Sequence, residues 1–261
     1  LHEGQALTRL HGLVGRPVGD PSRLVSTVDL QDVAEYAAVL LLELPQREIG
    51  GQLPSWDELV AQIELARSHG TALHLDGARL LECTPHYGRP PADIAALFDS
   101  VYVSLYKGLG GVAGCVLAGE EQLGAEAREW RVRHGGALFG MWPYAAAGLA
   151  GLRRRWPRMT AYAEHARAVA LELAALDGVE LVPDHPPTNM MHLHLRAPAE
   201  PLTAAMRRRA EHEDLWTWPK GFPTERPDWQ AVELTVGDAT LEWTPDEVRE
   251  LVSTLLHEAA A

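Results

Sequence analysis

The chain has 261 residues, which is enough for one large domain or for a large and a small one. Hydrophobic residues make up 46% and charged residues 23%, an ordinary globular composition that argues against a disordered chain. The formal net charge of −13 at pH 7 argues against a nucleic-acid-binding face and against binding to an anionic membrane.

Other sequence features place the protein among cytoplasmic proteins. No stretch approaches the roughly 20 apolar residues that a membrane-spanning helix needs. The two cysteines, Cys83 and Cys115, are too few for a disulfide framework and lack metal-finger spacing. Residues 1–4 do not begin a signal peptide, because no basic region precedes an apolar one. We therefore expect a cytoplasmic protein without a metal site or a membrane partner.

The first half of the chain alternates strand-like and helix-like segments. Ala37–Leu44 is an apolar run that ends at Pro45, as expected for a strand buried on both faces. Ser55 and Glu58 have the spacing of a capping box, which predicts a helix that runs to about residue 69. Further strands are expected at residues 71–75, 100–105 and 112–117, and a short helix at 91–98. This order indicates parallel βα units and a three-layer α/β domain.

The last third of the chain has a different pattern. Residues 120–176 are helical in pattern, with a break at Trp156-Pro157. The run Arg153-Arg154-Arg155 is interpreted as a solvated helix end, where positive side chains are favourable. Beyond the break, strands are expected at residues 179–182, 189–195, 215–218 and 230–236, and helices at 201–213 and 245–259. We therefore expect two domains, residues 1–156 and a small α+β domain of residues 157–261.

Two charged residues follow predicted strands. Asp76 and Lys107 are each expected at the carboxyl end of a strand, and such ends lie close together in a parallel sheet. Pyridoxal-phosphate (PLP) chemistry needs a lysine amine for the cofactor aldehyde and a carboxylate that keeps the pyridine nitrogen protonated. By itself the pair is weak evidence, because Asp-Gly is usually a turn and Lys-Gly after a strand is usually a loop.

Four sequence blocks surround this pair. They are LE at residues 42–43 with GGQLP at 50–54, HLDGARL at 74–80, SLYKGLG at 104–110 with GCVLAG at 114–119, and TNM at 188–190. In this order they resemble the threonine aldolase and β-eliminating lyase family of fold-type I PLP enzymes. The resemblance implies a PLP-transferase-like large domain with a mostly parallel sheet, here residues 1–156, and the small domain of residues 157–261.

The resemblance also implies roles for matching residues. Lys107 would hold the cofactor PLP and take part in proton transfer, and Asp76 would pair with the pyridine nitrogen. Arg79 would lie over the cofactor's ring oxygen or a substrate carboxylate, with a salt bridge to Asp76 or another acid as the alternative. Ser104 and the glycines after Lys107 would shape the lysine loop.

The chain also departs from the family pattern. The family's first section, which supplies a phosphate-binding turn and a histidine stacked on the ring, has no counterpart. It lies in another segment, comes from another chain, or leaves the site incomplete. Gln46 stands at a family histidine position beside Arg47, and both are candidate substrate-binding residues. Phe139 and Glu233 stand where the family has arginines for the phosphate and the substrate carboxylate. Because an acid repels a carboxylate, Arg47 is expected to compensate.

These observations predict a PLP-dependent lyase that cleaves a β-hydroxy-α-amino acid to glycine and an aldehyde. One alternative is β-elimination or another PLP reaction on an amino acid. A second is a degenerate, non-catalytic family member, favoured by the missing section and the two lost arginines but disfavoured by the presence of both Asp76 and Lys107. The resemblance implies a homodimer or homotetramer with active sites between subunits.

Overall fold

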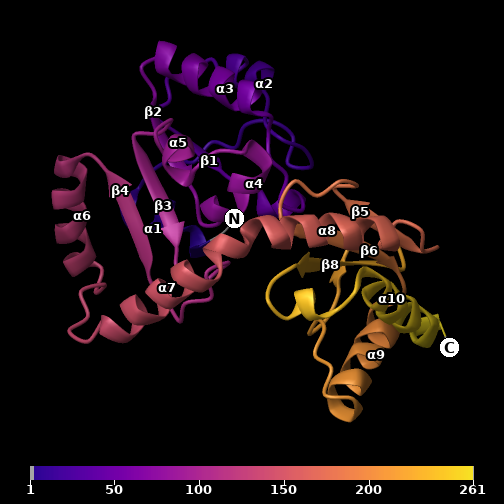
Figure 1. Ribbon diagram of the computed structural model, residues 1–261. Helices are drawn as coiled ribbons and strands as arrows, with labels where there is room; N and C mark the ends of the chain where they lie inside the picture. The colour runs from indigo at the N-terminus through magenta and orange to yellow at the C-terminus, as the bar shows by residue number, and fades with distance from the viewer. Residues whose placement is uncertain (1–2, 261) are drawn as a thin grey trace.

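The computed structural model describes residues 3–260, and these contain two four-stranded sheets linked by a row of helices (Figure 1). The first sheet has the order β1-β2-β3-β4. Its strands are β1 (Val39–Glu43), β2 (Ala72–Asp76), β3 (Ser100–Ser104) and β4 (Cys115–Gly119). The first three are parallel, as predicted, and β4 is antiparallel to β3. The direction of β4 follows from its connection, because residues 105–114 contain no helix and a parallel neighbour needs a longer crossover.

Only one face of the first sheet is covered by helices of the described residues. Leu42, Leu75 and Val101 point to this face and form a core with α3 (Trp56–Ser68) and with the short segments that follow β2. On the other face Val39 is 55% exposed and Leu41 is 58% exposed. The prediction that the first strand is buried on both faces is therefore wrong for this chain. The short segments are η3 (Leu80–Cys83), α4 (Thr84–Tyr87) and α5 (Pro91–Ala95).

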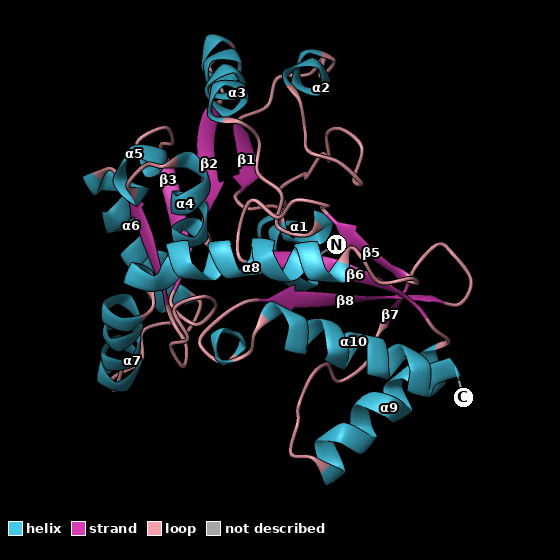
Figure 2. Cartoon of the chain, turned by 45° about the vertical axis from the view of Figure 1, so that its right-hand side comes forward, coloured by secondary structure: helices cyan, strands magenta, loops and turns pink. Residues whose placement is uncertain are grey.

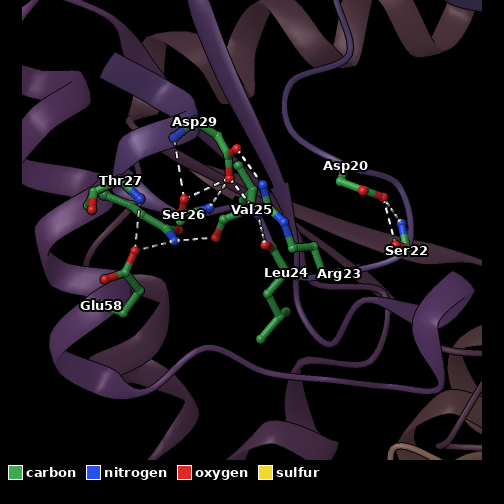
Figure 3. A network of polar contacts seen from close by, with 10 residues as sticks. Asp20, Ser22, Arg23, Leu24, Val25, Ser26, Thr27, Asp29 and Glu58 are labelled. Atoms are coloured by element: carbon green, nitrogen blue, oxygen red, sulfur yellow. Dashed lines mark hydrogen bonds and ion pairs between the residues drawn. The ribbon is translucent and has the colours of Figure 1, made fainter. Parts of the chain in front are cut away.

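The segment before β1 is tied to α3 by polar contacts (Figure 3). It contains η1 (Glu3–Gln5), α1 (Ala6–His11) and α2 (Thr27–Gln31). The Arg23 guanidinium donates two hydrogen bonds of 2.7 Å to Asp29, and the Thr27 N–H donates to the Glu58 carboxylate at 2.8 Å. Ser55 caps α3 as predicted, by accepting the Glu58 N–H at 3.2 Å. The predicted capping box is only half formed, because the Glu58 carboxylate binds Thr27 instead.

A chain of helices leads from the first sheet to the second (Figure 1). It consists of α6 (Glu121–Arg133), α7 (Trp142–Arg154) and α8 (Met159–Leu173). The predicted break is a 3-10 turn, η4 (Trp156–Arg158), between α7 and α8. Helix α8 packs on the second sheet through Tyr162, Ala166 and Val169, all of them buried.

The second sheet is antiparallel and has the order β5-β6-β8-β7 (Figure 2). Its strands are β5 (Val179–Val182), β6 (Met190–Arg196), β7 (Phe222–Pro223) and β8 (Trp229–Thr235), with η5 (Thr240–Glu242) after them. Helices α8, α9 (Ala199–His212) and α10 (Pro245–Ala260) complete its core. The predicted strand at residues 215–218 is wrong. The Trp218 indole donates to the Glu233 carbonyl at 2.7 Å. This segment therefore contacts β8 through a side chain and forms no backbone hydrogen-bond ladder with it.

The loop after β1 meets the second sheet at two glycines. An ideal Cβ on Gly50 would lie 1.8 Å from the Val182 carbonyl oxygen, and one on Gly51 would lie 2.9 Å from the Thr188 hydroxyl. Both glycines also have positive φ, of 77° and 75°. Only glycine fits here, because any side chain would collide with the second sheet. The division of the chain at residues 156 and 157 into two domains stays a prediction.

Candidate active site

A row of polar side chains crosses the open face of the first sheet at the carboxyl ends of its parallel strands. Glu43 of β1 is the register partner of Asp76 of β2, and Asp76 is the partner of Tyr102 of β3. Successive side chains in a strand alternate between faces, so these three lie opposite the helix-covered face that buries Leu42 and Leu75. Functional groups in parallel sheets gather at the carboxyl ends of the strands. Asp76 lies at such an end, as predicted.

The Asp76 carboxylate is half-buried and is anchored through one oxygen. Its Oδ1 accepts the Ala78 N–H at 3.1 Å, while its backbone carbonyl accepts the Leu44 N–H at 3.0 Å. The Glu43 carboxyl beside it has a raised pKa, first because of burial and then because of the Asp76 charge. Two carboxyl groups therefore lie side by side, and the negative charge of Asp76 increases the proton affinity of Glu43.

Lys107 lies in a tightly turned loop after β3. Ser104 is buried beneath this loop, and its hydroxyl accepts the N–H groups of Tyr106 and Lys107 at 3.2 Å each. The Gly110 N–H donates to the Lys107 carbonyl at 2.8 Å and closes the turn. Lys107 itself is half-buried. Ser104 and the glycine after Leu109 thus hold the backbone on both sides of the lysine.

Three charged groups of the site are free of ion pairs within residues 3–260. Asp76, Arg79 and Lys107 take part in none of the salt bridges found there, so the alternative role of Arg79 as a structural partner of an acid is not what the structure has. Arg79 and Lys107 both lower the pKa of Glu43, which places the two cations within electrostatic reach of this carboxyl. A carboxylate, an amine and a guanidinium are therefore available to a bound molecule.

Glu82 is a functional candidate that sequence reasoning missed. Its side chain is 4% exposed and lies under the lysine loop, where an ideal Cβ on Gly108 would meet Oε1 at 1.9 Å. Burial raises the pKa of Glu82 to about 7, and the charges of Arg79 and Lys107 oppose that rise. Its only signal in the sequence is its place between two apolar neighbours, three residues after Arg79.

The candidate substrate-binding residues lie in the loop after β1. Gln46 forms an isolated bridge with Gln52, and Arg47 begins η2 (Arg47–Ile49). The Arg47 Nε lies 2.7 Å from Glu233 Oε2, and its Nη1 lies 3.1 Å from Glu48 Oε1. The register partner of Glu233 on β6 is His192, whose Nε2 is 4.0 Å from the same Glu233 oxygen. The structure thus joins Arg47 to Glu233, the acid that the family resemblance predicts in place of an arginine, whereas Phe139 is fully exposed in the turn between α6 and α7.

The family model of the β-eliminating lyases matches residues 10–196. The chain belongs to this family. It is 27% identical over 68% of its length to low-specificity L-threonine aldolase 1 of Arabidopsis thaliana, of which it covers 49%. It is 32% identical over 54% of its length to the low specificity L-threonine aldolase of Escherichia coli, of which it covers 42%. The chain thus spans about half the length of the curated relatives it matches.

A solved structure agrees with this family membership. The crystal structure of a proposed L-allo-threonine aldolase from Listeria monocytogenes superposes with a TM-score of 0.90 and 37% identity, over 99% of this chain and 72% of that one. The fold-type I architecture that the sequence predicted is therefore confirmed, with its mostly parallel first sheet.

Membership of the β-eliminating lyases indicates PLP as the cofactor, and the donor set on the open face fits this group. PLP needs an amine free to react and a carboxylate free to pair with a ring nitrogen. Lys107 and Asp76 meet both needs, since neither is ion-paired within residues 3–260 and Asp76 uses one oxygen for the Ala78 N–H. The described residues contain no group of three or more His, Cys, Asp or Glu arranged for a metal ion. Across the same residues, no helix is long and apolar enough to span a membrane.

Proposed function

We propose that this chain carries the cofactor lysine of a PLP-dependent lyase that cleaves a β-hydroxy-α-amino acid to glycine and an aldehyde. The observation that carries the proposal is the placement of Asp76 and Lys107 at the carboxyl ends of neighbouring strands, with neither side chain ion-paired within residues 3–260. Threonine aldolases among the relatives support the choice of reaction.

The roles of the residues follow from their charges and positions. Lys107 would hold the cofactor aldehyde through its amine and, once released, would move a proton at the substrate α-carbon. Asp76 would keep the pyridine nitrogen protonated, and Arg79 would supply positive charge for an anionic oxygen. When bound, PLP withdraws the negative charge that develops at the α-carbon. Ser104 holds the Lys107 backbone by a hydrogen bond, which would fix the point from which the lysine side chain extends toward the α-carbon.

Arg47 is proposed to bind the substrate carboxylate. It stands beside Glu233, at the place where the family arginine is lost, so a guanidinium is present there although it comes from the loop after β1. Its Nε and Nη1 are engaged by Glu233 and Glu48, which leaves Nη2 for a ligand. Arg47→Ala should raise the KM for the amino acid more than it lowers kcat, because it removes a binding group and leaves Lys107 in place. An unchanged KM would contradict this role.

The first test is the visible absorbance of the protein after addition of PLP and dialysis. The chain has two lysines, Lys107 and the exposed Lys220, so Lys220→Ala is a matched control for Lys107→Ala. The lysine-bound cofactor band is expected in the parent and in Lys220→Ala, and its absence is expected in Lys107→Ala. A band that survives in Lys107→Ala and disappears in Lys220→Ala would overturn the assignment.

Product analysis separates the proposed reaction from β-elimination, which the family name also supports. Glycine and an aldehyde are expected from a β-hydroxy-α-amino acid such as threonine. Pyruvate and ammonia from serine would favour β-elimination instead. If no band forms and no product appears, a non-catalytic role in a larger assembly takes first place.

The setting of the enzyme is also proposed. We propose a cytoplasmic homodimer or homotetramer that acts on an amino acid without nucleic acid or membrane. Both cysteines are free thiols, Cys83 buried and Cys115 exposed, which suits a reducing compartment. Exposed apolar side chains on the first sheet and on α6 and α7, among them Val116, Leu117, Trp130 and Trp142, suit burial between subunits.

A further inference from the structure

Helix α7 lies directly against the lysine loop. An ideal Cβ on Gly151 would lie 2.0 Å from the Leu109 carbonyl oxygen, and one on Gly148 would lie 3.0 Å from Leu105 Cδ1. Both glycines are buried. The helix therefore approaches the loop backbone more closely than any larger residue would allow, and the end of α7 falls beside the turn that carries Lys107.

The arginine run at the end of α7 contains two kinds of residue. Arg153 and Arg154 are exposed, as expected for a solvated helix end. Arg155 is half-buried, so the interpretation is wrong for this residue. Its Nε donates to Asp238 Oδ2 at 3.0 Å, and its guanidinium lies against Gly110, where an ideal Cβ would meet Nη1 at 1.9 Å.

Asp238 fixes this guanidinium from the far side. Its carboxylate also accepts hydrogen bonds from Arg158 and from the Tyr162 hydroxyl. Tyr162 is 2% exposed and belongs to the core of the second sheet. The Tyr162 hydrogen bond, followed by the charges of Arg155 and Arg158, lowers the pKa of Asp238, so this group stays ionised at neutral pH. Asp238 thus binds Arg155, Arg158 and the buried Tyr162, and Arg155 contacts both Asp238 and the lysine loop.

We infer that Arg155 is a positioning residue for Lys107. Arg155 contacts Gly110, and the Gly110 N–H donates to the Lys107 carbonyl at 2.8 Å. A displacement of the guanidinium is therefore expected to move the Lys107 backbone through this hydrogen bond. Its anchor comes from the segment after β8, 83 residues further along the chain. The position of the lysine loop is in this way set by the C-terminal part of the molecule. The inference rests on the proposed function only in giving Lys107 a cofactor to hold.

Amide hydrogen exchange of the cofactor-free protein tests the inference without any activity. Arg155→Met should raise exchange in residues 105–111 about tenfold, because the turn loses its packing partner. Arg158→Met is the matched control: it removes an arginine from the same Asp238 but leaves the Gly110 contact. Exchange in residues 105–111 should rise clearly less in Arg158→Met than in Arg155→Met. Equal exchange in the parent and Arg155→Met, or equal increases in both variants, would overturn the inference.

A spectroscopic measurement then connects the loop to the lysine. The pH midpoint of the Lys107-bound cofactor band should shift in Arg155→Met and return toward the parent value in Arg155→Lys, which keeps a positive charge beside Gly110. An unshifted midpoint in Arg155→Met would overturn the positioning role. If Arg155→Met does not fold, hydrogen exchange of Arg155→Lys decides: a smaller increase confined to residues 105–111 is expected, and no increase would overturn the inference. A parent without a band contradicts the proposed function, and the exchange comparison still tests the contact.

Discussion

The two sheets of this chain differ in how completely their strands are buried. In β6 of the second sheet, Met191, Leu193 and Leu195 are fully buried beneath α8, α9 and α10. In the first sheet every residue of β4 is exposed, and β1 turns Val39 and Leu41 to the outside. Helices pack on one face of each sheet. What differs is the polarity of the face that the helices leave uncovered, which carries two histidines in β6 and the apolar residues Val39 and Leu41 in β1.

This difference separates stability from chemistry. The second sheet concentrates apolar burial, which is the main favourable contribution to folding. The first sheet keeps one face open, and Glu43, Asp76 and Tyr102 stand in a row on that face. A substitution in the second sheet should therefore be felt first as a loss of stability, and one on the open face first as a loss of ligand binding.

The largest effect is expected from a large-to-small change in the second core. Leu193→Ala should lower the free energy of unfolding by about 3–4 kcal/mol, because it leaves a cavity beneath packed helices. Leu41→Ala, which is 58% exposed, should cost less than about 1 kcal/mol. Urea unfolding of both variants measures the contrast. Equal losses would mean that the open face is covered in solution, for instance by another copy of the chain.

A pH-dependent effect is expected from Glu82. In the folded protein its pKa is about 7, against 4.5 as its ordinary value. Below pH 4.5 the carboxyl is protonated in both states. Between pH 4.5 and 7 the unfolded chain loses its proton first, so the free energy of unfolding should fall by about 3 kcal/mol and then level off.

Glu82→Gln should remove this fall, since a neutral amide does not titrate. Unfolding by urea at pH 5 and pH 7.5, for the parent and the variant, gives the comparison. A parent whose stability changes no more than the variant's between these pH values would show that the Glu82 carboxyl ionises freely in the folded protein.

A moderate effect is expected at the start of α3, which covers the first sheet. Ser55→Ala removes the hydroxyl that accepts the Glu58 N–H and should cost about 1 kcal/mol. Ser68→Ala, at the exposed end of the same helix, is the control and should be nearly neutral. Thermal unfolding resolves the two. A cost at Ser68 equal to that at Ser55 would argue against the cap.

The smallest effect is expected on the surface of the second sheet. Arg226 donates two bonds of 2.7 Å to Glu180, but both side chains are exposed. Arg226→Gln should therefore cost less than about 1 kcal/mol. That cost should shrink further in 0.5 M salt, where the Debye length is less than half of its value of about 10 Å at 0.1 M. A loss comparable to that of Leu193→Ala would contradict the contrast between core and surface.

Local sequence predicted the strand ends but not their long-range partners. The strands before Asp76 and Lys107 were predictable because apolar alternation stops at a glycine-containing turn in both places. The antiparallel direction of β4 had a signal too, in a connection of residues 105–114 that is too short for a helical crossover. Residues 215–218 were misread, because the aromatic alternation that suggests a strand here serves a single indole hydrogen bond from Trp218.

Contacts between distant segments account for what sequence could not provide. Arg155 reads as one of three solvated arginines until Asp238, 83 residues later, is placed beside it. Glu82 lies in an apolar run, and nothing local marks it as buried under the loop of a lysine 25 positions away. Arg47 and Glu233 meet only because the loop after β1 reaches the second sheet. Each of these positions depends on tertiary packing, which periodicity does not encode.

The contact between Gly50 and the Val182 carbonyl bears on protein engineering. Not even one methyl group fits between them, so the loop that carries Gln46 and Arg47 packs its backbone directly against the end of β5. A chimera that takes its first 156 residues from one homologue and the remainder from another would need matching backbones at this contact. The loop of Gln46 and Arg47 and the segment after residue 156 must therefore be exchanged together, so swapping the C-terminal segment alone is a poor route to a new specificity.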